Sequence, residues 1–143
     1  HDALPIFYFI TIMSTIFQKI IDGEIPCYKV AENADFLAFL DVNPLAKGHA
    51  LVIPKKAVDY IFDMEDDALA AMHVFAKRVA KAIQQVVPCK KIGMAVIGLE
   101  VPHAHIHLVP MNQVADLNFA GPRAQLTKED FETTAAAISQ LFI

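Results

Sequence analysis

The sequence predicts an α+β fold, in which an antiparallel sheet of about five strands carries one long helix across one face and a second helix follows at the C-terminus. Short apolar runs bounded by turn residues occupy the first part of the chain, a long stretch with helical periodicity follows, and two further strand-like runs come after it. The chain has 143 residues, of which 55% are hydrophobic and 20% charged, so a compact domain with a substantial core is expected.

A short helix and three strands are expected first. Ser14 or Thr15 is suited to cap a helix that runs through Ile21 and ends near Gly23. A turn separates the first two strands, and a loop precedes the third. The three strands are expected at residues 27–32, 36–41 and 49–54.

The segment before this helix differs from the rest of the chain. Residues 1–12 are strongly apolar, but they are too few to span a bilayer and they lack the basic region and the cleavage site of a signal peptide. We expect residues 1–12 to be a vector-derived or otherwise non-native leader. Met13 is then the natural start, and residues 13–143 form a single domain.

The clearest helix is expected over residues 65–87. Glu65, Asp66 and Asp67 place negative charge in its first turn, which suits the helix dipole, and Pro88 ends it. Its apolar residues recur at helical spacing and predict the face that packs on the core. These residues are Leu69, Met72, Phe75 or Ala76, Val79, Ile83 and Val86.

Two more strands are expected over residues 91–97 and 103–109, and the tight connection between them predicts an antiparallel hairpin. Residues 111–124 show no regular pattern. Thr127 is suited to cap a last helix, which is expected to pack against the domain or a partner subunit. The apolar residues of this helix are Phe131, Ala135, Ile138 and Phe142.

The second of these strands contains three of the chain's six histidines. Alternation with a period of two places His103, His105 and His107 on one face and Ala104, Ile106 and Leu108 on the other, toward the core. Pro102 favours an extended backbone before the row, and Pro110 is expected to end the pairing of the strand. Such a row predicts a functional site.

Three interpretations of the row are open on the residues alone. The histidines could be a polar strand face turned to solvent, although strand faces more often use Thr, Lys or Glu. They could bind a metal, because neutral imidazole is a common ligand. They could also supply a nucleophile that neighbouring histidines orient and assist. The spacing of side chains on a strand separates the last two only weakly.

Residues 103–109 resemble the motif of the histidine triad (HIT) family, in which three histidines alternate with apolar residues. Further segments resemble the signatures of this family in the same order along the chain, from about residue 16 to residue 110. These segments are 17–26, 39–44 and 48–56. The resemblance implies the HIT-like fold, usually as a homodimer whose sheets join across a twofold axis. Because four segments match in order, it weighs strongly against the metal interpretation, and neither a metal nor a cofactor is expected.

The resemblance also implies chemistry, which is the transfer of a nucleoside monophosphate group through a covalent intermediate on His105. Imidazole is a competent nucleophile near neutral pH when one ring nitrogen is free and the other is held by a hydrogen bond. In the family this bond is made by the carbonyl of the first histidine of the triad, here His103. His107 and His49 are then expected to contact the phosphate oxygens.

The nucleoside end follows from the same matches. Asp41 matches the carboxylate that binds the ribose hydroxyls in the family. The apolar residues that match the base pocket are Phe17, Ile20, Ile25, Phe39 and Val42. For Phe39 and Ile25, an ordinary core position is an equally good explanation.

One segment departs from the pattern of the family. The loop before the triad usually carries Gln-Ser or Gln-Thr toward the phosphates, whereas this chain has Leu99 and Glu100, and no asparagine stands near Val96 or Ile97. Glu100 would repel a phosphate when ionised but could donate a proton when neutral. We therefore expect Glu100 to protonate or position the leaving group.

The most favoured function is hydrolysis or transfer of a nucleoside monophosphate from a phosphoramidate or a related phosphoanhydride. A dinucleoside polyphosphate hydrolase is the nearest alternative, and a nucleotide-binding module with little catalysis is the alternative of a different class. The formal charge of −4 gives no general attraction to nucleic acid, so nonspecific nucleic-acid binding is not expected. Cys27 and Cys89 are expected to be reduced thiols of a cytoplasmic protein that does not bind membranes.

Overall fold

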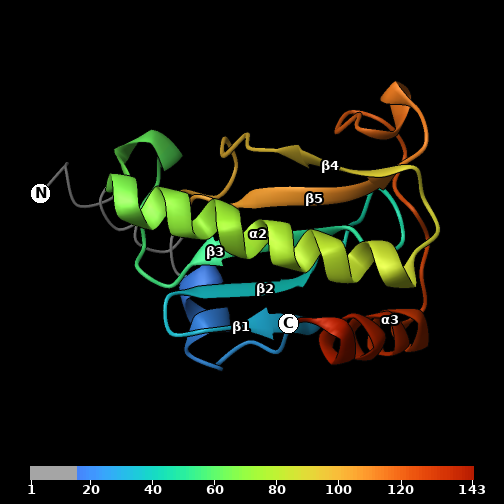
Figure 1. Cartoon of the computed structure of the whole chain (residues 1–143), viewed down its shortest axis with the longest axis horizontal. Coiled ribbons are helices and arrows are strands. Elements are labelled where there is room, and N and C mark those ends of the chain that lie inside the picture. Colours follow the sequence, from blue (N-terminus) through green and yellow to red (C-terminus); the bar gives the residue numbers. More distant parts are fainter. Residues whose placement is uncertain (1–15) are drawn as a thin grey trace, which may run out of the picture.

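The computed structural model describes residues 16–143, and it consists of one sheet with helices on both of its faces (Figure 1). The predictions for residues 1–12 and for a cap at Ser14 or Thr15 lie outside the described residues. The sheet is antiparallel throughout and has the strand order β1-β2-β3-β5-β4. Its strands are β1 (Lys29–Glu32), β2 (Phe36–Leu40), β3 (Ala50–Pro54), β4 (Lys91–Ala95) and β5 (Ile106–Met111). The predicted fold class is confirmed.

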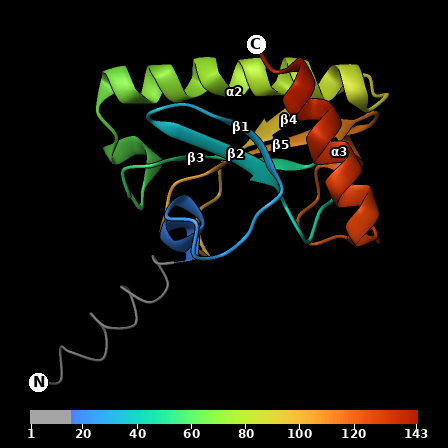
Figure 2. The same cartoon turned by 90° about the horizontal axis from the view of Figure 1, so that it is seen from below.

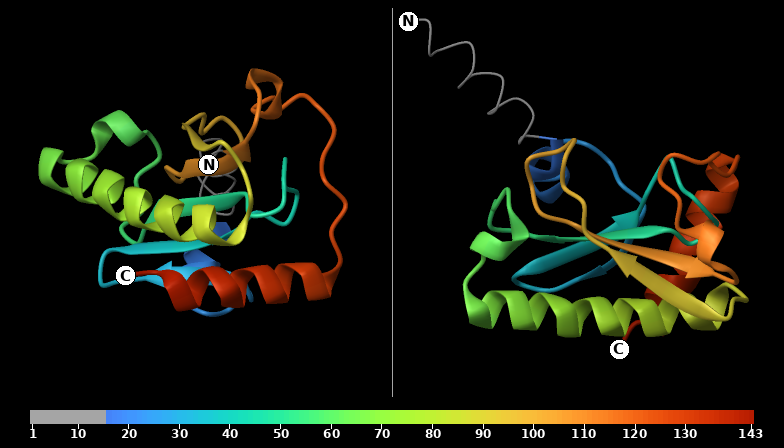
Figure 3. Two further views of the ribbon diagram at one scale, coloured as in Figure 1. Left: turned by 45° about the vertical axis from the view of Figure 1, so that its right-hand side comes forward. Right: turned by 90° about the horizontal axis from the view of Figure 1, so that it is seen from above.

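The helix α2 (Asp66–Val86) crosses one face of the sheet, and the helical residues 16–21 lie on the opposite face (Figure 2). Glu65 is the N-cap of α2, and acidic residues fill the first turn as predicted. The helix at residues 16–21 is followed by a turn at Gly23, whose φ of 79° suits a residue without a side chain. The right-hand view of Figure 3 shows the same separation of the two helices by the sheet.

The central strands are buried on both faces, and alternate residues serve two different clusters. In β2, Ala38 and Leu40 join the main core under α2, whereas Leu37 and Phe39 join a smaller cluster around Phe17. In β5, the residues predicted to face the core do so, and these are Ile106 and Leu108, together with Ala104 just before the strand. The side chain of His107 therefore points away from α2, toward the face that carries residues 16–21.

The C-terminal helix α3 (Lys128–Leu141) packs beside β1 and against α2 (Figure 1). The Thr127 hydroxyl accepts a hydrogen bond from the Asp130 amide at 3.0 Å, and the Asp130 carboxylate accepts one from the Thr127 amide at 2.9 Å. The predicted capping threonine is therefore confirmed as half of a reciprocal capping box. Two short 3₁₀ helices complete the described part of the chain, η1 (Ile61–Asp63) and η2 (Val114–Asp116).

The predicted boundaries of the last hairpin are wrong at both strands. β4 ends at Ala95 and β5 begins at Ile106, so the connection is much longer than residues 98–102. Pro110 does not end the pairing, because it lies opposite Ile92 within β5. Proline has no N–H to donate to a neighbouring strand. Pro110 is tolerated because the pairing of β5 with β3 stops at Leu108, so no residue of β3 requires a hydrogen bond from its nitrogen.

Among residues 16–143, no helix is long and apolar enough to cross a membrane.

Candidate active site

A cleft of about 550 Å³ opens on the face of the sheet opposite α2. Every residue predicted to bind the nucleoside lines it, namely Phe17, Ile20, Ile25, Phe39, Asp41 and Val42. Of the predicted catalytic residues, His105, His107 and Glu100 line the cleft, whereas His103 and His49 are buried behind its wall. The fold thus brings the predicted nucleoside-binding residues and the predicted catalytic residues together in one cavity. The ring centres of Phe17 and His105 are 5.2 Å apart.

The protonation of His105 follows from one hydrogen bond. Its Nδ1 lies 2.8 Å from the backbone carbonyl oxygen of His103, and because a carbonyl can only accept, Nδ1 must carry the proton. The neutral ring then has its lone pair on Nε2. His105 lines the cleft with only 7% of its surface exposed, so Nε2 is available to a bound substrate but largely shielded from bulk water. This is the arrangement required of an imidazole nucleophile.

His103 contributes its backbone to this arrangement and points its side chain elsewhere. The ring is fully buried, and its Nε2–H donates to the carbonyl oxygen of Pro54 at 2.7 Å. Among the described residues, Nδ1 of His103 has no hydrogen-bond partner. Burial lowers the pKa of His103, although the bond to Pro54 opposes that effect. A neutral His103 anchors the segment before β5 to the end of β3, which fixes the carbonyl that orients His105.

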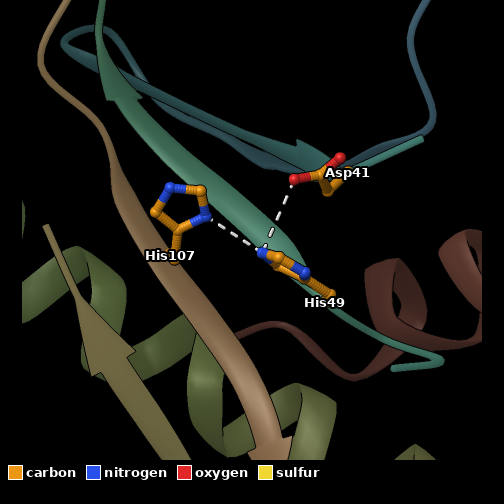
Figure 4. A group of neighbouring side chains, drawn as sticks. All are labelled: Asp41, His49 and His107. Atoms are coloured by element: carbon orange, nitrogen blue, oxygen red, sulfur yellow. Dashed lines mark hydrogen bonds and ion pairs between the residues drawn. The ribbon is translucent and has the colours of Figure 1, made fainter. Parts of the chain in front are cut away.

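His49 and His107 form a second hydrogen-bonded chain, shown in Figure 4. The amide of Leu45 donates to Nδ1 of His49 at 2.9 Å, so the proton of the neutral His49 ring is on Nε2. That Nε2–H donates to Nδ1 of His107 at 3.0 Å. The neutral His107 ring must then carry its own proton on Nε2, and it becomes a hydrogen-bond donor for whatever occupies the cleft. The backbone of a distant loop therefore determines the tautomer of a residue on β5.

Both rings of this chain are neutral at physiological pH. Burial lowers the pKa of His49 to about 4, and the positive charge of Arg123 acts in the same direction. Burial likewise lowers the pKa of His107 to about 4, assisted by electrostatic interactions with His105, His49 and Arg123 and opposed by Asp41. The deduced tautomers hold because neither ring takes up a second proton near pH 7.

Asp41, His49 and His107 also form a group whose possible ligand atoms lie within 4.8 Å of one another. The Asp41 carboxylate approaches Nε2 of His49 at 3.6 Å (Figure 4). A metal ion at this point would need the lone pair of that nitrogen, but the bond from Leu45 to Nδ1 puts a proton there instead. His49 and His107 are therefore joined by a hydrogen bond with Asp41 close beside them, and the three side chains do not present an open set of metal ligands.

Phe119 and Arg123 are among the cleft residues that were not expected from the sequence. The Phe119 ring lies edge-on to His107, with ring centres 4.7 Å apart, and covers part of the His49–His107 chain. Arg123 lies over Phe119, with its guanidinium carbon 5.8 Å from the ring centre. Both belong to a segment without periodicity, which reaches the cleft because the amide of Ala124 donates to the carbonyl of Pro44 at 2.8 Å. No local pattern in the sequence predicts this contact.

The long connection between β4 and β5 forms another wall of the cleft. Leu99, Glu100 and Val101 line it; the Leu99 side chain is 89% exposed, whereas Val101 packs against the cluster around Phe17. The backbone turns at Gly98, whose φ of 70° is rarely adopted by residues with a side chain. The place of Glu100 beside the triad agrees with its expected position, and its role remains a prediction.

Comparison with known proteins identifies the family. The family model described as "HIT domain" matches residues 22–114. The adenosine 5'-monophosphoramidase hnt1 of Schizosaccharomyces pombe is 36% identical over 129 residues, which cover 89% of this chain and 97% of that protein. The adenosine 5'-monophosphoramidase HNT1 of Saccharomyces cerevisiae is 38% identical over 116 residues, which cover 80% of this chain and 73% of that protein.

Solved structures agree with this assignment. A zinc-bound histidine triad family protein of Mycobacterium smegmatis superposes with a TM-score of 0.75 at 30% identity, covering 90% of this chain and 96% of its own. A hypothetical histidine triad nucleotide-binding protein of Sulfolobus tokodaii has the same TM-score at 29% identity, covering 88% of this chain and 90% of its own. The sequence match, the fold and the three histidines before and within β5 agree, and the chain belongs to the histidine triad family.

Proposed function

We propose that this protein is a HIT-type nucleotide hydrolase that cleaves a nucleoside monophosphate from a phosphoramidate or a related phosphoanhydride, through a nucleotidyl intermediate on His105. The observation that carries this proposal is the 2.8 Å bond between Nδ1 of His105 and the carbonyl of His103, because it leaves the lone pair of Nε2 facing the cleft. The similarity to two yeast adenosine 5'-monophosphoramidases supports the class of substrate.

The reaction has two steps. In the first, Nε2 of His105 attacks phosphorus, a P–N bond to the histidine forms, and the bond from phosphorus to the leaving group breaks with its electron pair going to the leaving atom, which takes a proton. In the second, water attacks phosphorus and gives one proton to the group that protonated the leaving atom, the bond to His105 breaks with its electron pair returning to Nε2, and the nucleoside monophosphate is released with the histidine restored. His107 donates its Nε2–H to a phosphate oxygen in both transition states, and His49 keeps that donor in place.

Glu100 is proposed to protonate or position the leaving group. It lines the cleft together with His105, so it can reach a group that departs from phosphorus on that side. Replacement of Glu100 by Gln keeps the size of the side chain and removes the acid. Turnover and its pH profile should both change in Glu100→Gln, and an enzyme with an unchanged rate and profile would refute this role.

The nucleoside is proposed to lie between the apolar residues around Phe17 and the carboxylate of Asp41. Phe17 and Phe39 meet edge to face with ring centres 5.8 Å apart, and they give the cleft an apolar wall against which a purine base can pack. One oxygen of Asp41 accepts the amide of Asn43 at 2.8 Å, which fixes the carboxylate at the rim of the cleft, where ribose hydroxyls can donate to it.

The test is a comparison of the wild type with His105→Ala on an adenosine phosphoramidate, with intact mass measured after rapid quenching. We expect turnover and a transient nucleotidyl adduct in the wild type and neither in the variant. A dinucleoside polyphosphate in the same assay distinguishes the nearest alternative substrate. If the wild type binds nucleotide tightly but turns nothing over, the protein is a binding module, and the hydrolase proposal is wrong.

A homodimer is proposed to form through β4. This strand is at an edge of the sheet, whereas α3 packs beside the other edge strand, β1. Apolar side chains are exposed on β4 and just after it, including Met94 at 53%, Ile97 at 45% and Val96 at 39%. An uncovered edge with exposed apolar residues favours pairing with a second chain. Light scattering should give twice the mass of the chain, and Met94→Glu should shift it toward the monomer.

A further inference from the structure

The cleft contains little positive charge for a ligand that carries a phosphate. Of the described residues that line it, Arg123 is the only lysine or arginine, and the carboxylates of Asp41 and Glu100 line the same cavity. A phosphate group that enters the cleft therefore meets two acidic side chains in a partly desolvated place. Such repulsion is substantial unless a fixed cation lies nearby.

Arg123 is held in place by neutral groups. Its Nη1 donates to the carbonyl of Asn43 at 3.0 Å, and its Nη2 donates to the carbonyl of Phe119 at 2.8 Å. A guanidinium has five N–H donors, so most of them stay free after these two bonds. None of the ion pairs found among residues 16–143 involves Arg123. The guanidinium is thus oriented by the backbone but not neutralised.

The neighbouring histidines do not supply the missing charge. His49 and His107 have pKa values lowered to about 4 by burial, and the charge of Arg123 contributes to both shifts. Near neutral pH these rings can donate hydrogen bonds, yet they carry no net charge. The positive charge of Arg123 therefore makes protonation of the two buried imidazoles less favourable. A bound anion would neutralise that charge.

We propose that Arg123 is a substrate-binding residue whose guanidinium pairs with the non-bridging oxygens of the phosphate that His105 attacks. Guanidinium matches phosphate with two parallel hydrogen bonds, which gives orientation as well as charge. Arg123 is anchored to Asn43, two residues beyond the ribose-binding candidate Asp41, so the cation lies at the phosphate nearest the ribose. The inference rests on the proposed function, because it assumes that the cleft receives a nucleotide.

The experiment compares the affinities of AMP and adenosine for the full chain by calorimetry, in the wild type and in Arg123→Gln. AMP affinity should fall about tenfold or more in the variant, as expected for the loss of a charge-assisted contact, while adenosine affinity stays the same. Arg123→Lys should recover part of the loss, because it restores the charge without the two parallel donors. Arg78→Gln is the matched control, since Arg78 is the chain's other arginine and lies outside the cleft, over Phe142.

Each other result overturns the assignment. If AMP and adenosine lose affinity equally in Arg123→Gln, the residue only holds the loop around Asn43. If AMP binding is unchanged but a dinucleoside polyphosphate binds more weakly, the guanidinium contacts the leaving group and not the attacked phosphate. If Arg78→Gln weakens AMP as much as Arg123→Gln, the effect is one of overall charge. A wild type that binds no AMP would instead defeat the proposed function itself, which keeps the two failures distinct.

Discussion

Acidification between pH 7 and pH 5 should destabilise this protein through its buried histidines. Burial lowers the pKa of His49 and of His107 to about 4, whereas an unfolded histidine titrates near its ordinary value of about 6.5. As the pH falls below about 6.5, His49 and His107 become protonated in the unfolded chain but stay neutral in the folded chain. The contribution of these two histidines to the free energy of unfolding is therefore fully present above about pH 6.5 and declines as the pH falls toward 4. Below about pH 4 it changes no further.

The magnitude follows from the two pKa values. For one histidine with folded and unfolded values of about 4 and about 6.5, the free energy of unfolding falls by about 2 kcal/mol between pH 7 and pH 5. His49 and His107 together should account for about 4 kcal/mol, since both are neutral in the folded state over this range and their unfolded forms titrate independently. His103 adds to the loss, because burial lowers its pKa as well.

Urea unfolding followed by far-ultraviolet circular dichroism measures this loss at a series of pH values. Carboxylates contribute little between pH 7 and pH 5, because those with shifted pKa values, such as Glu32 and Asp130, are shifted downward and stay ionised there. His49→Gln removes one of the three groups and should reduce the slope by less than half, because His107 and His103 still contribute. A free energy of unfolding that stays constant from pH 7 to pH 5, or a slope that His49→Gln leaves unaltered, would refute the protonation states deduced for the cleft.

Other predictions concern the loop, the nucleoside site and the last helix. Gly48→Ala should destabilise the protein by about 2–4 kcal/mol in urea unfolding, because Gly48 has a φ of 90° and the new Cβ would lie 2.8 Å from a methyl of Val87. Asp41→Asn should weaken AMP binding about tenfold in calorimetry but leave 2',3'-dideoxy-AMP unaffected, as expected for a lost charged contact to the ribose hydroxyls; equal losses would argue against ribose recognition. Thr127→Ala should cost about 1 kcal/mol in thermal or urea unfolding without altering turnover, because neither Thr127 nor its partner Asp130 lines the cleft.

The parts of the fold that depend on local periodicity could be predicted from the sequence. The apolar positions of α2 recur at helical spacing, and most of them are buried under the sheet as expected, among them Met72, Val79 and Ile83. The alternation around Ile106 and Leu108 correctly placed one face of β5 in the core. In each case the residues that decide the structure are close neighbours in sequence, so the pattern and its physical cause coincide.

The start of β5 shows where this reasoning stops. His103 and His105 continue the alternation of the strand, yet they precede its first ladder pair, because β3 pairs with β5 only from Val52 opposite Ile106. The segment is instead attached by other bonds, from the amide of Ala104 to the carbonyl of Val58 and from the ring of His103 to Pro54. An alternating sequence specifies an extended backbone, but the partner of that backbone is determined by tertiary structure.

The chemistry of the site depends on such distant partners even more than the fold does. The sequence alone indicates that His107 is a candidate donor, but which of its nitrogens donates depends on His49 and, through it, on the amide of Leu45. That amide sits in a loop stabilised by Arg123, which bonds to Asn43 from a segment with no recognisable pattern. For a substitution at Arg123, both the affinity for AMP and the pH dependence of the free energy of unfolding should therefore be measured. Because burial is the larger cause of both lowered pKa values, a residue that binds substrate should lose phosphate affinity while most of the pH dependence remains, whereas one that only maintains the tautomer of His107 should change both.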